Sequence, residues 1–320
     1  MSDAHDGPAG RGSGADDAAS RDAGARRTGA LLVIAAAALW STGGVGVKVA
    51  DAAPLVVAGL RSVFALAFML VVMTVQLRGQ PRALAVIAAL LRRPLVWGAA
   101  ASYALMVVMF VLAARRTTAA NAIFIQYTAP IYVALLSGPL LGEKPARSDL
   151  FATGACVVGM ALTFGGELGG GRAAGNLLAV LSSFGFAGLP LLLRVDQKRL
   201  DPETAARAPL VAMSLGNALA AAVALPAMIA EPPSGPAAGR TLVVLILLGT
   251  LQIGLPYVFY GVAVRRLRAL ESSLLATIEP VLSPIWVLLA TGEQPSAMAA
   301  AGGAVIVAAV VLQTIGKRRR

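Results

Sequence analysis

The sequence predicts an all-α integral membrane protein with ten transmembrane helices, built as two inverted repeats of five helices each. The first observation is composition: 58% of the 320 residues are hydrophobic, 13% are charged and the mean hydropathy is +0.77, whereas about a quarter of the residues in an ordinary globular chain are charged. The second observation is an internal repeat, in which a set of residues recurs 150 positions later without a gap. The first copy consists of Ala113, Arg115, Arg116, Ala119, Pro130, Gly142, Glu143 and Pro145, and the second of Ala263, Arg265, Arg266, Ala269, Pro280, Gly292, Glu293 and Pro295.

The duplication determines how the two halves are oriented. Each copy holds five apolar segments, and because five is odd, the second copy enters the bilayer in the opposite orientation to the first. Inverted repeats of this kind are common in secondary transporters. Residues 29–166 form the first repeat and residues 167–316 the second, inverted repeat. Residues 1–28, which lack apolar periodicity, form a disordered cytoplasmic tail, and residues 317–320 form a basic cytoplasmic tail.

Each predicted span rests on length and apolar content, since a helix that crosses the hydrocarbon core needs about 20 mostly apolar residues. The ten segments that meet this requirement are 30–47, 54–77, 94–114, 118–141, 148–166, 174–193, 205–230, 240–264, 269–291 and 297–316. Prolines inside several of these segments are compatible with helices, because neighbouring helices in a bundle can satisfy the carbonyl groups that they free.

The basic residues predict the orientation. With a cytoplasmic amino terminus, the two tails and the even-numbered loops carry 21 of the 27 Lys and Arg residues, and the odd-numbered loops carry 5. The remaining one, Arg61, lies within the 54–77 span. Because cytoplasmic loops are enriched in Lys and Arg, both termini of this multi-pass protein are expected to be cytoplasmic. Attraction to anionic lipid explains the net charge of +11 more simply than nucleic-acid binding does.

Several classes of function are disfavoured by the residues that the sequence lacks. The single histidine, His5, lies in the tail, and the single cysteine, Cys156, lies within a span and has no disulfide partner. No imidazole is therefore available in the spans for a metal site, a catalytic dyad or a proton relay. No phosphate-binding glycine loop followed by Lys and Ser or Thr occurs. We predict no catalytic residues, no metal and no cofactor, and we expect the protein not to be an enzyme.

Glu279 is the main candidate for a functional residue at membrane depth. It lies ten residues into the 269–291 span, or about 15 Å deep at a rise of about 1.5 Å per residue. An ionised carboxylate there needs a partner, a water-lined cavity or a proton. Ser272, Ala276, Glu279 and Ser283 share one helical face. The equivalent face of the 118–141 span consists of Ala122, Gln126, Ala129 and Val133. We expect these two faces to meet, with Gln126 and Ala276 lining a common cavity, although a purely structural role for Glu279 is equally compatible with the sequence.

The remaining candidates each have a structural alternative. Arg61 lies about 10 Å deep, where it could contact substrate, form a fixed ion pair or extend its side chain toward the interface. Trp40 lies near mid-membrane rather than at an interface. Other polar or aromatic side chains that could line the cavity or simply pack are Tyr103, Tyr127, Tyr257 and Ser283. The motif residues Pro130, Gly142, Pro280 and Gly292 are interpreted as structural, and Glu143 and Glu293 as interfacial helix ends with a possible gating role.

The motif residues resemble a known family. The stretch from Thr117 to Pro145, with Ala119, Asn121, Pro130, Gly142-Glu143 and then Gly154 and Gly159, is similar to the signature of EamA-type transporters in the drug/metabolite transporter superfamily. Glu279-Pro280 and Gly292-Glu293 resemble the same signature in the second half, and Leu39-Trp40 with Lys48 resembles the first helix of that family. The resemblance covers residues 30–316. It implies a basket of helices around a central cavity that moves small metabolites, often outward, across a bacterial plasma membrane.

These observations together predict a secondary transporter of small organic metabolites that works by alternating access. We expect efflux coupled to proton entry, with Glu279 as the proton carrier and the lipid bilayer as its other partner. An uptake permease or facilitator of the same fold is the nearest alternative. A more distant alternative is an integral-membrane enzyme that acts on a lipid-linked substrate. The sequence leaves substrate identity, direction, coupling ion and oligomeric state open.

Overall fold

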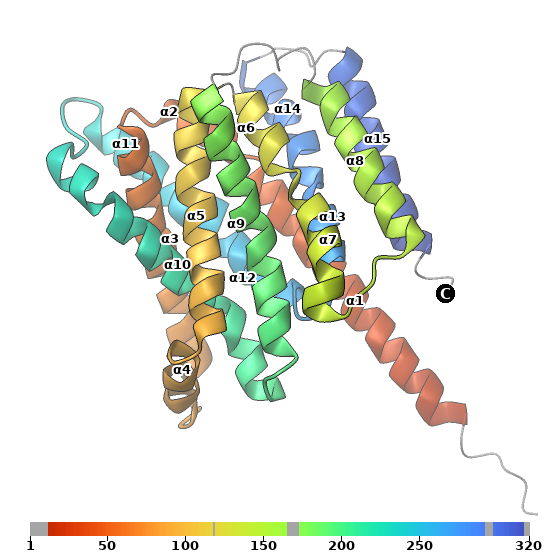
Figure 1. Cartoon of the computed structure of the whole chain (residues 1–320). Helices are drawn as coiled ribbons and strands as arrows, with labels where there is room; N and C mark the ends of the chain where they lie inside the picture. The colour runs from red at the N-terminus through yellow and green to blue at the C-terminus, as the bar shows by residue number, and fades with distance from the viewer. Residues whose placement is uncertain (1–11, 118, 165–172, 292–296, 317–320) are drawn as a thin grey trace, which may run out of the picture.

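The computed structural model describes residues 12–117, 119–164, 173–291 and 297–316, and within these ranges the regular structure is entirely helical (Figure 1). In chain order the helices are α1 (Gly12–Trp40), α2 (Gly43–Val49), α3 (Pro54–Leu77), α4 (Ala83–Leu91), α5 (Pro94–Arg116), α6 (Ala119–Gln126), α7 (Ala129–Leu141), α8 (Arg147–Phe164), α9 (Ala173–Gln197), α10 (Pro202–Ala230), α11 (Ala238–Leu247), the π-helix η2 (Leu248–Gly254), α12 (Leu255–Ala263), α13 (Ala269–Ala276), α14 (Ile278–Thr291) and α15 (Ala297–Gly316). Each predicted span therefore contains one helix or a broken helix.

The helices have the length and surface of membrane spans. Five continuous helical stretches in the described residues are long and apolar enough to cross a bilayer: α3, α5, α9, α10 and the run from α11 to α12. Shorter apolar helices cover Ala129–Leu141 and Ala300–Leu312. Large apolar side chains point outward, including Leu135, Phe151 and Leu289, each at least 70% exposed. Because such surfaces are costly in water and favourable in lipid, the chain is a multi-pass membrane protein.

Two spans that were expected to be continuous are broken in the middle. The 118–141 span divides into α6 and α7 between Gln126 and Ala129, and the 269–291 span divides into α13 and α14 at Thr277. Pro130 is the second residue of α7 and Pro280 the third residue of α14. Proline lacks the backbone N–H that a continuous helix needs, but it fits the first turn of a new helix. The breaks lie 150 residues apart, so the duplicated motif specifies them in both repeats.

Two other regions also differ from the expected helices. The first span ends at Trp40 and resumes as α2 at Gly43, and the 240–264 span contains the π-helix η2 in place of regular α-helix. At the start of the chain, α1 begins at Gly12, so residues 12–28 form part of a helix here, whereas the sequence was expected to leave them disordered. This segment is rich in alanine, which has the highest helix propensity. The rest of the predicted disordered tail lies outside the described residues.

The two repeats are interleaved rather than side by side. Helix α9, the first helix of the second repeat, packs on α5, α6 and α7 of the first repeat, and α1 correspondingly packs on α12, α13 and α14. The contact of α9 with α5 is close at Gly185, where a Cβ atom would lie 2.5 Å from the carbonyl oxygen of Ser102. The beginning of α1 and the end of α15 both lie toward the lower end of the bundle in Figure 1. We call this the terminal end.

Candidate functional site

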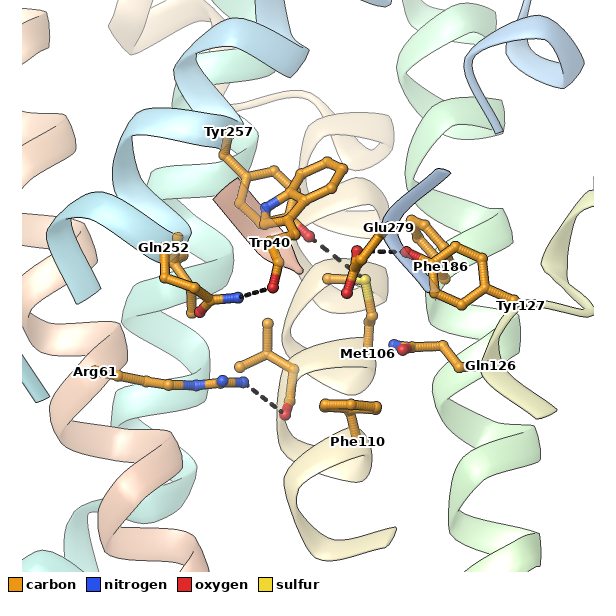
Figure 2. A pocket seen from close by; sticks show the side chains of 12 residues that line it. Trp40, Arg61, Met106, Phe110, Gln126, Tyr127, Phe186, Gln252, Tyr257 and Glu279 are labelled. Carbon is orange, nitrogen blue, oxygen red and sulfur yellow. Dashed lines mark hydrogen bonds between the residues drawn. The ribbon is translucent and has the colours of Figure 1, made fainter. Parts of the chain in front are cut away.

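The helix breaks surround a central cavity of about 70 Å³ (Figure 2). Both repeats contribute to its wall, from the end of α1, from α3, α5 and α9, from the α6–α7 and α13–α14 breaks, and from η2 and α12. The residues that line it are Trp40, Arg61, Met106, Val107, Phe110, Gln126, Tyr127, Phe186, Gln252, Ile253, Tyr257 and Glu279. Irregular backbone at membrane depth is tolerated where it lines a cavity, and it is typical of transporter sites.

Glu279 and Tyr127 join the two repeats across the cavity. The Tyr127 hydroxyl donates a hydrogen bond to Oε2 of Glu279. Tyr127 lies between α6 and α7 and is 1% exposed, whereas Glu279 lies in the first turn of α14 and retains part of its surface toward the cavity. The partial positive charge of a helix N-terminus favours a carboxylate at this position. The two helix breaks therefore meet through a direct hydrogen bond, which comes from Tyr127, a neighbour of the expected polar face, and not from a member of that face.

Aromatic rings form one side of the cavity. The centroid of the Trp40 ring lies 4.8 Å from that of Tyr257 and 5.6 Å from that of Tyr260. Tyr103 packs edge-on against Tyr257 with a centroid distance of 4.7 Å. Tilted and edge-on pairs at these distances are favourable because of the charge distribution of the rings. The Tyr257 side chain is thereby held between α1 and α5.

Arg61 is buried beside the cavity without a carboxylate partner. Its side chain reaches from α3 toward α5, where Nη2 donates a hydrogen bond of 3.4 Å to the carbonyl oxygen of Val107 (Figure 2). The residue is 5% exposed and its Nε atom has no hydrogen-bond partner. Among the described residues no acidic side chain forms an ion pair with it. A buried guanidinium in this state is costly, because charges in protein interiors are normally paired.

Two neighbouring polar groups in the wall are also incompletely bonded. Gln252 donates from Nε2 to the carbonyl oxygen of Trp40 at 3.1 Å, but its Oε1 atom is buried without a partner. Nε1 of Trp40 is likewise buried and unbonded. By contrast, Gln126 is fixed in place, because its Nε2 donates to Oγ of Ser182 at 2.9 Å. The unsatisfied atoms therefore lie on the Trp40, Arg61 and Gln252 side of the cavity.

The structure brings six of the eight predicted substrate or coupling candidates to the cavity: Trp40, Arg61, Gln126, Tyr127, Tyr257 and Glu279. Tyr103 lies behind the wall, where its hydroxyl accepts a 3.1 Å hydrogen bond from Nδ2 of Asn217. Ser283 is half-buried and is not part of the lining. Ala276 is fully buried and also does not line the cavity, so that part of the sequence expectation is wrong.

Sequence reasoning missed the other six lining residues, which are Met106, Val107, Phe110, Phe186, Gln252 and Ile253. Gln252 carried a usable signal, because it is an amide within an apolar span, as Gln126 is. The other five are apolar and cannot be distinguished from lipid-facing or packing residues by sequence pattern alone.

The motif residues occupy structural positions where they are described. Gly142 is the C-cap of α7 with φ of +65°, a conformation that favours glycine. Pro130 and Pro280 are buried at the helix breaks, and Cys156 is buried with its Sγ 3.6 Å from Oγ1 of Thr277. Gly292 and Glu293 lie outside the described residues.

Within the described residues, no group of three or more His, Cys, Asp or Glu side chains is placed to hold a metal ion.

An ion cluster ties the repeats together at the terminal end. The carboxylate of Glu143, just after α7, lies 3.0 Å from Nζ of Lys198, 3.1 Å from Nε of Arg194 and 3.9 Å from Nε of Arg268. We call these four residues the Glu143 cluster. Partial burial alone raises the pKa of Glu143, but the hydrogen bond from Lys198 and the charge of Arg194 outweigh it and lower the pKa below its usual value.

Further ion pairs connect the repeats at this end. Arg93 donates from Nε and Nη2 to Oδ1 of Asp196, at 2.9 and 2.7 Å. Arg26 lies 3.1 Å from Oε2 of Glu271. Like the Glu143 cluster, each pair has one member in residues 29–166 or the segment before it and the other in residues 167–316.

A second cavity, of about 410 Å³, opens between α3, α10 and α12. It is lined at its polar side by Gln76, Gln80, Arg207 and Arg265. Tyr257 lines both this cavity and the central one, so its side chain stands between them.

Comparison with known proteins gives one family and supports the fold. The EamA-like transporter family matches residues 27–165 and, a second time, residues 173–315. A protein from Streptantibioticus cattleyicolor described as a "Probable terminal-alkyne amino-acid exporter" is 30% identical over 202 residues, which cover 60% of this chain and 63% of that protein. The match thus spans less than two thirds of the relative's length. A solved structure described as "Crystal structure of protein" superimposes with a TM-score of 0.73 at 21% identity, over 92% of this chain and 98% of the other.

Proposed function

Since the chain belongs to the EamA-like transporter family, which matches it in two consecutive copies, we propose that it is a secondary transporter that exports small organic metabolites by alternating access. The observation that carries the proposal is the central cavity, which lies at the helix breaks and is crossed by the Tyr127–Glu279 hydrogen bond between the repeats. A site formed by both repeats changes its exposure when the repeats move relative to each other. The description of the relative as an exporter supports the outward direction.

In the proposed orientation the terminal end faces the cytoplasm, because the beginning of α1 and the end of α15 lie there and the loops expected on the cytoplasmic side carry most Lys and Arg residues. The larger cavity beside Arg207 and Arg265 then forms a cytoplasmic vestibule that leads to Tyr257. The central cavity of about 70 Å³ is smaller than typical small-molecule sites of about 300–1,000 Å³. We infer that the structure represents a contracted state of the site, and that substrate enters after Tyr257 and the helices around it have moved.

We assign the coupling proton to Glu279. Its carboxylate lies in the first turn of α14, contacts the cavity and has one described hydrogen bond, from Tyr127. Burial penalises the charged carboxylate, whereas the helix N-terminus and the tyrosine hydroxyl favour it. These opposing influences allow a proton to bind when the cavity is dry and to leave when it opens to water. Proton entry at Glu279 would then supply the free energy for export.

The first experiment identifies the substrate. Metabolites released and retained by cells with and without the protein are compared, and the compound that is lost from the cells faster when the protein is present is taken into reconstituted vesicles. Greater retention in the presence of the protein would instead favour the uptake alternative.

The second experiment tests coupling with Glu279→Gln, which keeps the shape of the side chain and removes its titration. In vesicles with an imposed pH gradient, we expect the variant to lose gradient-driven accumulation of that compound while retaining its exchange. Glu271→Gln is the matched control, because Glu271 is also a buried glutamate of the 269–291 span but pairs with Arg26 away from the cavity. Normal gradient-driven accumulation by Glu279→Gln would exclude this carboxylate as the proton carrier.

A further inference from the structure

We propose that the second cavity, between α3, α10 and α12, binds the headgroup of an anionic phospholipid, with the lipid phosphate held by Arg207 and Arg265. The cavity has a volume of about 410 Å³, and Gln76, Gln80 and Tyr257 line it together with these two arginines. In the contracted state the headgroup occupies the vestibule beside Tyr257, so the lipid is a bound ligand and not the transported metabolite. Only the assignment of its leaflet to the cytoplasmic side rests on the proposed function.

The two arginines share one wall of this cavity. Arg265, just after α12, donates from Nη1 to the carbonyl oxygen of Ala206 at 3.4 Å, and Ala206 precedes Arg207 in α10. In the part of the chain that the structure describes, Arg265 forms no ion pair. Partial burial and the neighbouring charge of Arg266 both lower the pKa of Arg265. An anion at this position would therefore relieve an unfavourable positive charge.

The acidic partner of Arg207 is distant. Nη1 of Arg207 lies 3.7 Å from Oε1 of Glu203, whose side chain is 55% exposed, and Nη2 donates a hydrogen bond to Oε1 of Gln80. Ion pairs with exposed partners contribute little to stability. Guanidinium groups, by contrast, bind phosphate oxygens through two parallel N–H donors. A phosphate in the cavity would therefore gain donors from Arg207 and Arg265 at the same time.

Helix α4 places the cavity at the level of the lipid headgroups. It lies at the terminal end in Figure 1 and packs on α10 and α5. Its nine residues are all apolar but too few to cross the hydrocarbon core, and Leu84 and Leu91 are 71% and 40% exposed. With Arg82 and Arg92 at its two ends, α4 has the composition of a helix that lies in the membrane interface. Gln80, in the turn before α4, lines the cavity, so the mouth of the cavity lies at this depth.

An apolar groove continues from the cavity toward α4. A smaller pocket is lined by Met73, Leu77 and Ile87, and it shares Leu210 and Arg207 with the larger cavity. Apolar walls next to two cations fit a ligand that carries both an acyl chain and a negatively charged headgroup. A free phosphate ester would bind the arginines but leave the groove empty. The anionic phospholipid is therefore the better match to the whole site.

The test is binding to the purified full-length protein in detergent, measured by native mass spectrometry with phosphatidylglycerol as the anionic probe. Phosphatidylcholine with the same acyl chains is the first comparison, because its choline cation offsets the charge of the phosphate. Glycerophosphoglycerol, which is the headgroup without acyl chains, is the second comparison. We expect phosphatidylglycerol to bind at least about tenfold more tightly than either, because two arginines attract its net charge and the groove accommodates part of a chain.

Two double variants with the same loss of charge separate the cavity from the surrounding surface. We expect Arg207→Gln combined with Arg265→Gln to bind phosphatidylglycerol at least about tenfold more weakly than the wild type, while its affinity for phosphatidylcholine changes less than about threefold. Arg78→Gln combined with Arg82→Gln is the matched control, because both arginines are exposed beside α4 and neither lines the cavity or the groove. The affinity of this control for phosphatidylglycerol should stay within about threefold of the wild type, since solvent screens exposed charges.

Three results would overturn the proposal. Equal affinity of the wild type for phosphatidylglycerol and phosphatidylcholine would do so without any variant, even if the double variants fail to fold. Equal losses in the two double variants would assign the preference to general surface charge and not to the cavity. Binding of glycerophosphoglycerol as tight as that of phosphatidylglycerol would replace the lipid with a free phosphate ester. These measurements involve no transport, so a negative result would leave the proposed export function intact.

Discussion

The Glu143 cluster provides a specific test of how the terminal end opens. Glu143 belongs to the first repeat and its three basic partners to the second, so the repeats cannot separate there without breaking these contacts. Glu143→Gln keeps the volume of the side chain and removes its charge. We expect this variant to spend more time with the terminal end open.

The size of the effect follows from the geometry. Exposed ion pairs contribute about 0.2–1 kcal/mol each, and hydrogen bonds to charged groups about 1.5–3 kcal/mol. The Glu143 side chain is 13% exposed, but Arg194 and Lys198 are 26% and 42% exposed, and Arg268 is distant at 3.9 Å. Because solvent screens these partly exposed partners, the contacts of Glu143 together should stabilise the closed terminal end by about 1.5 kcal/mol, the lower end of the range for hydrogen bonds to charged groups. Loss of that energy changes the ratio of open to closed states about tenfold.

The assay is the rate at which a cavity cysteine reacts with a thiol reagent added to the terminal side. Gln126→Cys in a Cys156→Ala background provides the reporter, since Gln126 lines the cavity and Cys156 is the sole native cysteine. We expect Glu143→Gln to raise the rate about tenfold. Glu203→Gln is the control, because Glu203 pairs with Arg207 within α10 and does not bridge the repeats. Equal rates in the two variants would refute the role of the Glu143 cluster in closure.

The same contacts predict a dependence on pH. The lowered pKa of Glu143 belongs to the closed state, in which Lys198 and Arg194 hold the carboxylate ionised. A carboxylate with a depressed pKa stabilises that state above its unperturbed pKa, and the stabilisation is lost as pH falls through the depressed value. The reaction rate of the wild type relative to that of Glu143→Gln should therefore stay constant near neutral pH, and it should rise toward one when the pH falls below the usual range of a glutamate.

Two further predictions concern packing and the cavity hydrogen bond. Gly185→Ala should lower the free energy of unfolding by about 1–3 kcal/mol, because the added Cβ would lie 2.5 and 2.7 Å from backbone atoms of α5. Gly154→Ala is the control and should have little effect, because its Cβ would meet nothing within 4 Å. Thermal unfolding in detergent measures both variants, and equal stability would contradict the close contact of α9 with α5. Tyr127→Phe removes the hydroxyl that donates a hydrogen bond to Glu279. Because that bond stabilises the ionised carboxylate, its loss should shift the pH of half-maximal gradient-driven transport upward. An unchanged pH profile would show that this bond does not influence proton binding.

The broad architecture could be predicted from sequence because it depends on signals that act over many residues. Apolar length located each span, and the fixed offset of 150 residues identified the two repeats. Both signals reflect burial in lipid, which constrains every residue of a spanning helix. The same reasoning identified Glu279, Arg61 and Gln126 as candidates, because a charged or amide side chain within an apolar span is costly and therefore conspicuous.

The breaks in the helices could not be predicted in this way, because proline alone does not determine them. Pro190, Pro209 and Pro226 lie inside continuous helices, whereas Pro130 and Pro280 begin new ones. The difference depends on tertiary neighbours, which either satisfy the freed backbone groups or leave a cavity for them to line. The π-helix η2 likewise has no sequence signature of its own, although it places Gln252 in the cavity wall.

The duplication also explains why the cavity is chemically asymmetric. The repeated motif keeps the helix breaks in both halves, but the charged cavity residues occur once each: Arg61 has Val211 as its counterpart 150 residues away, and Glu279 has Ala129. Opposite charges thus stand on different repeats, on either side of one site. Because the repeated motif accounts for the helix breaks and not for the charges, the scaffold around the cavity is common to both repeats, whereas each charged group that faces the cavity is specific to one repeat.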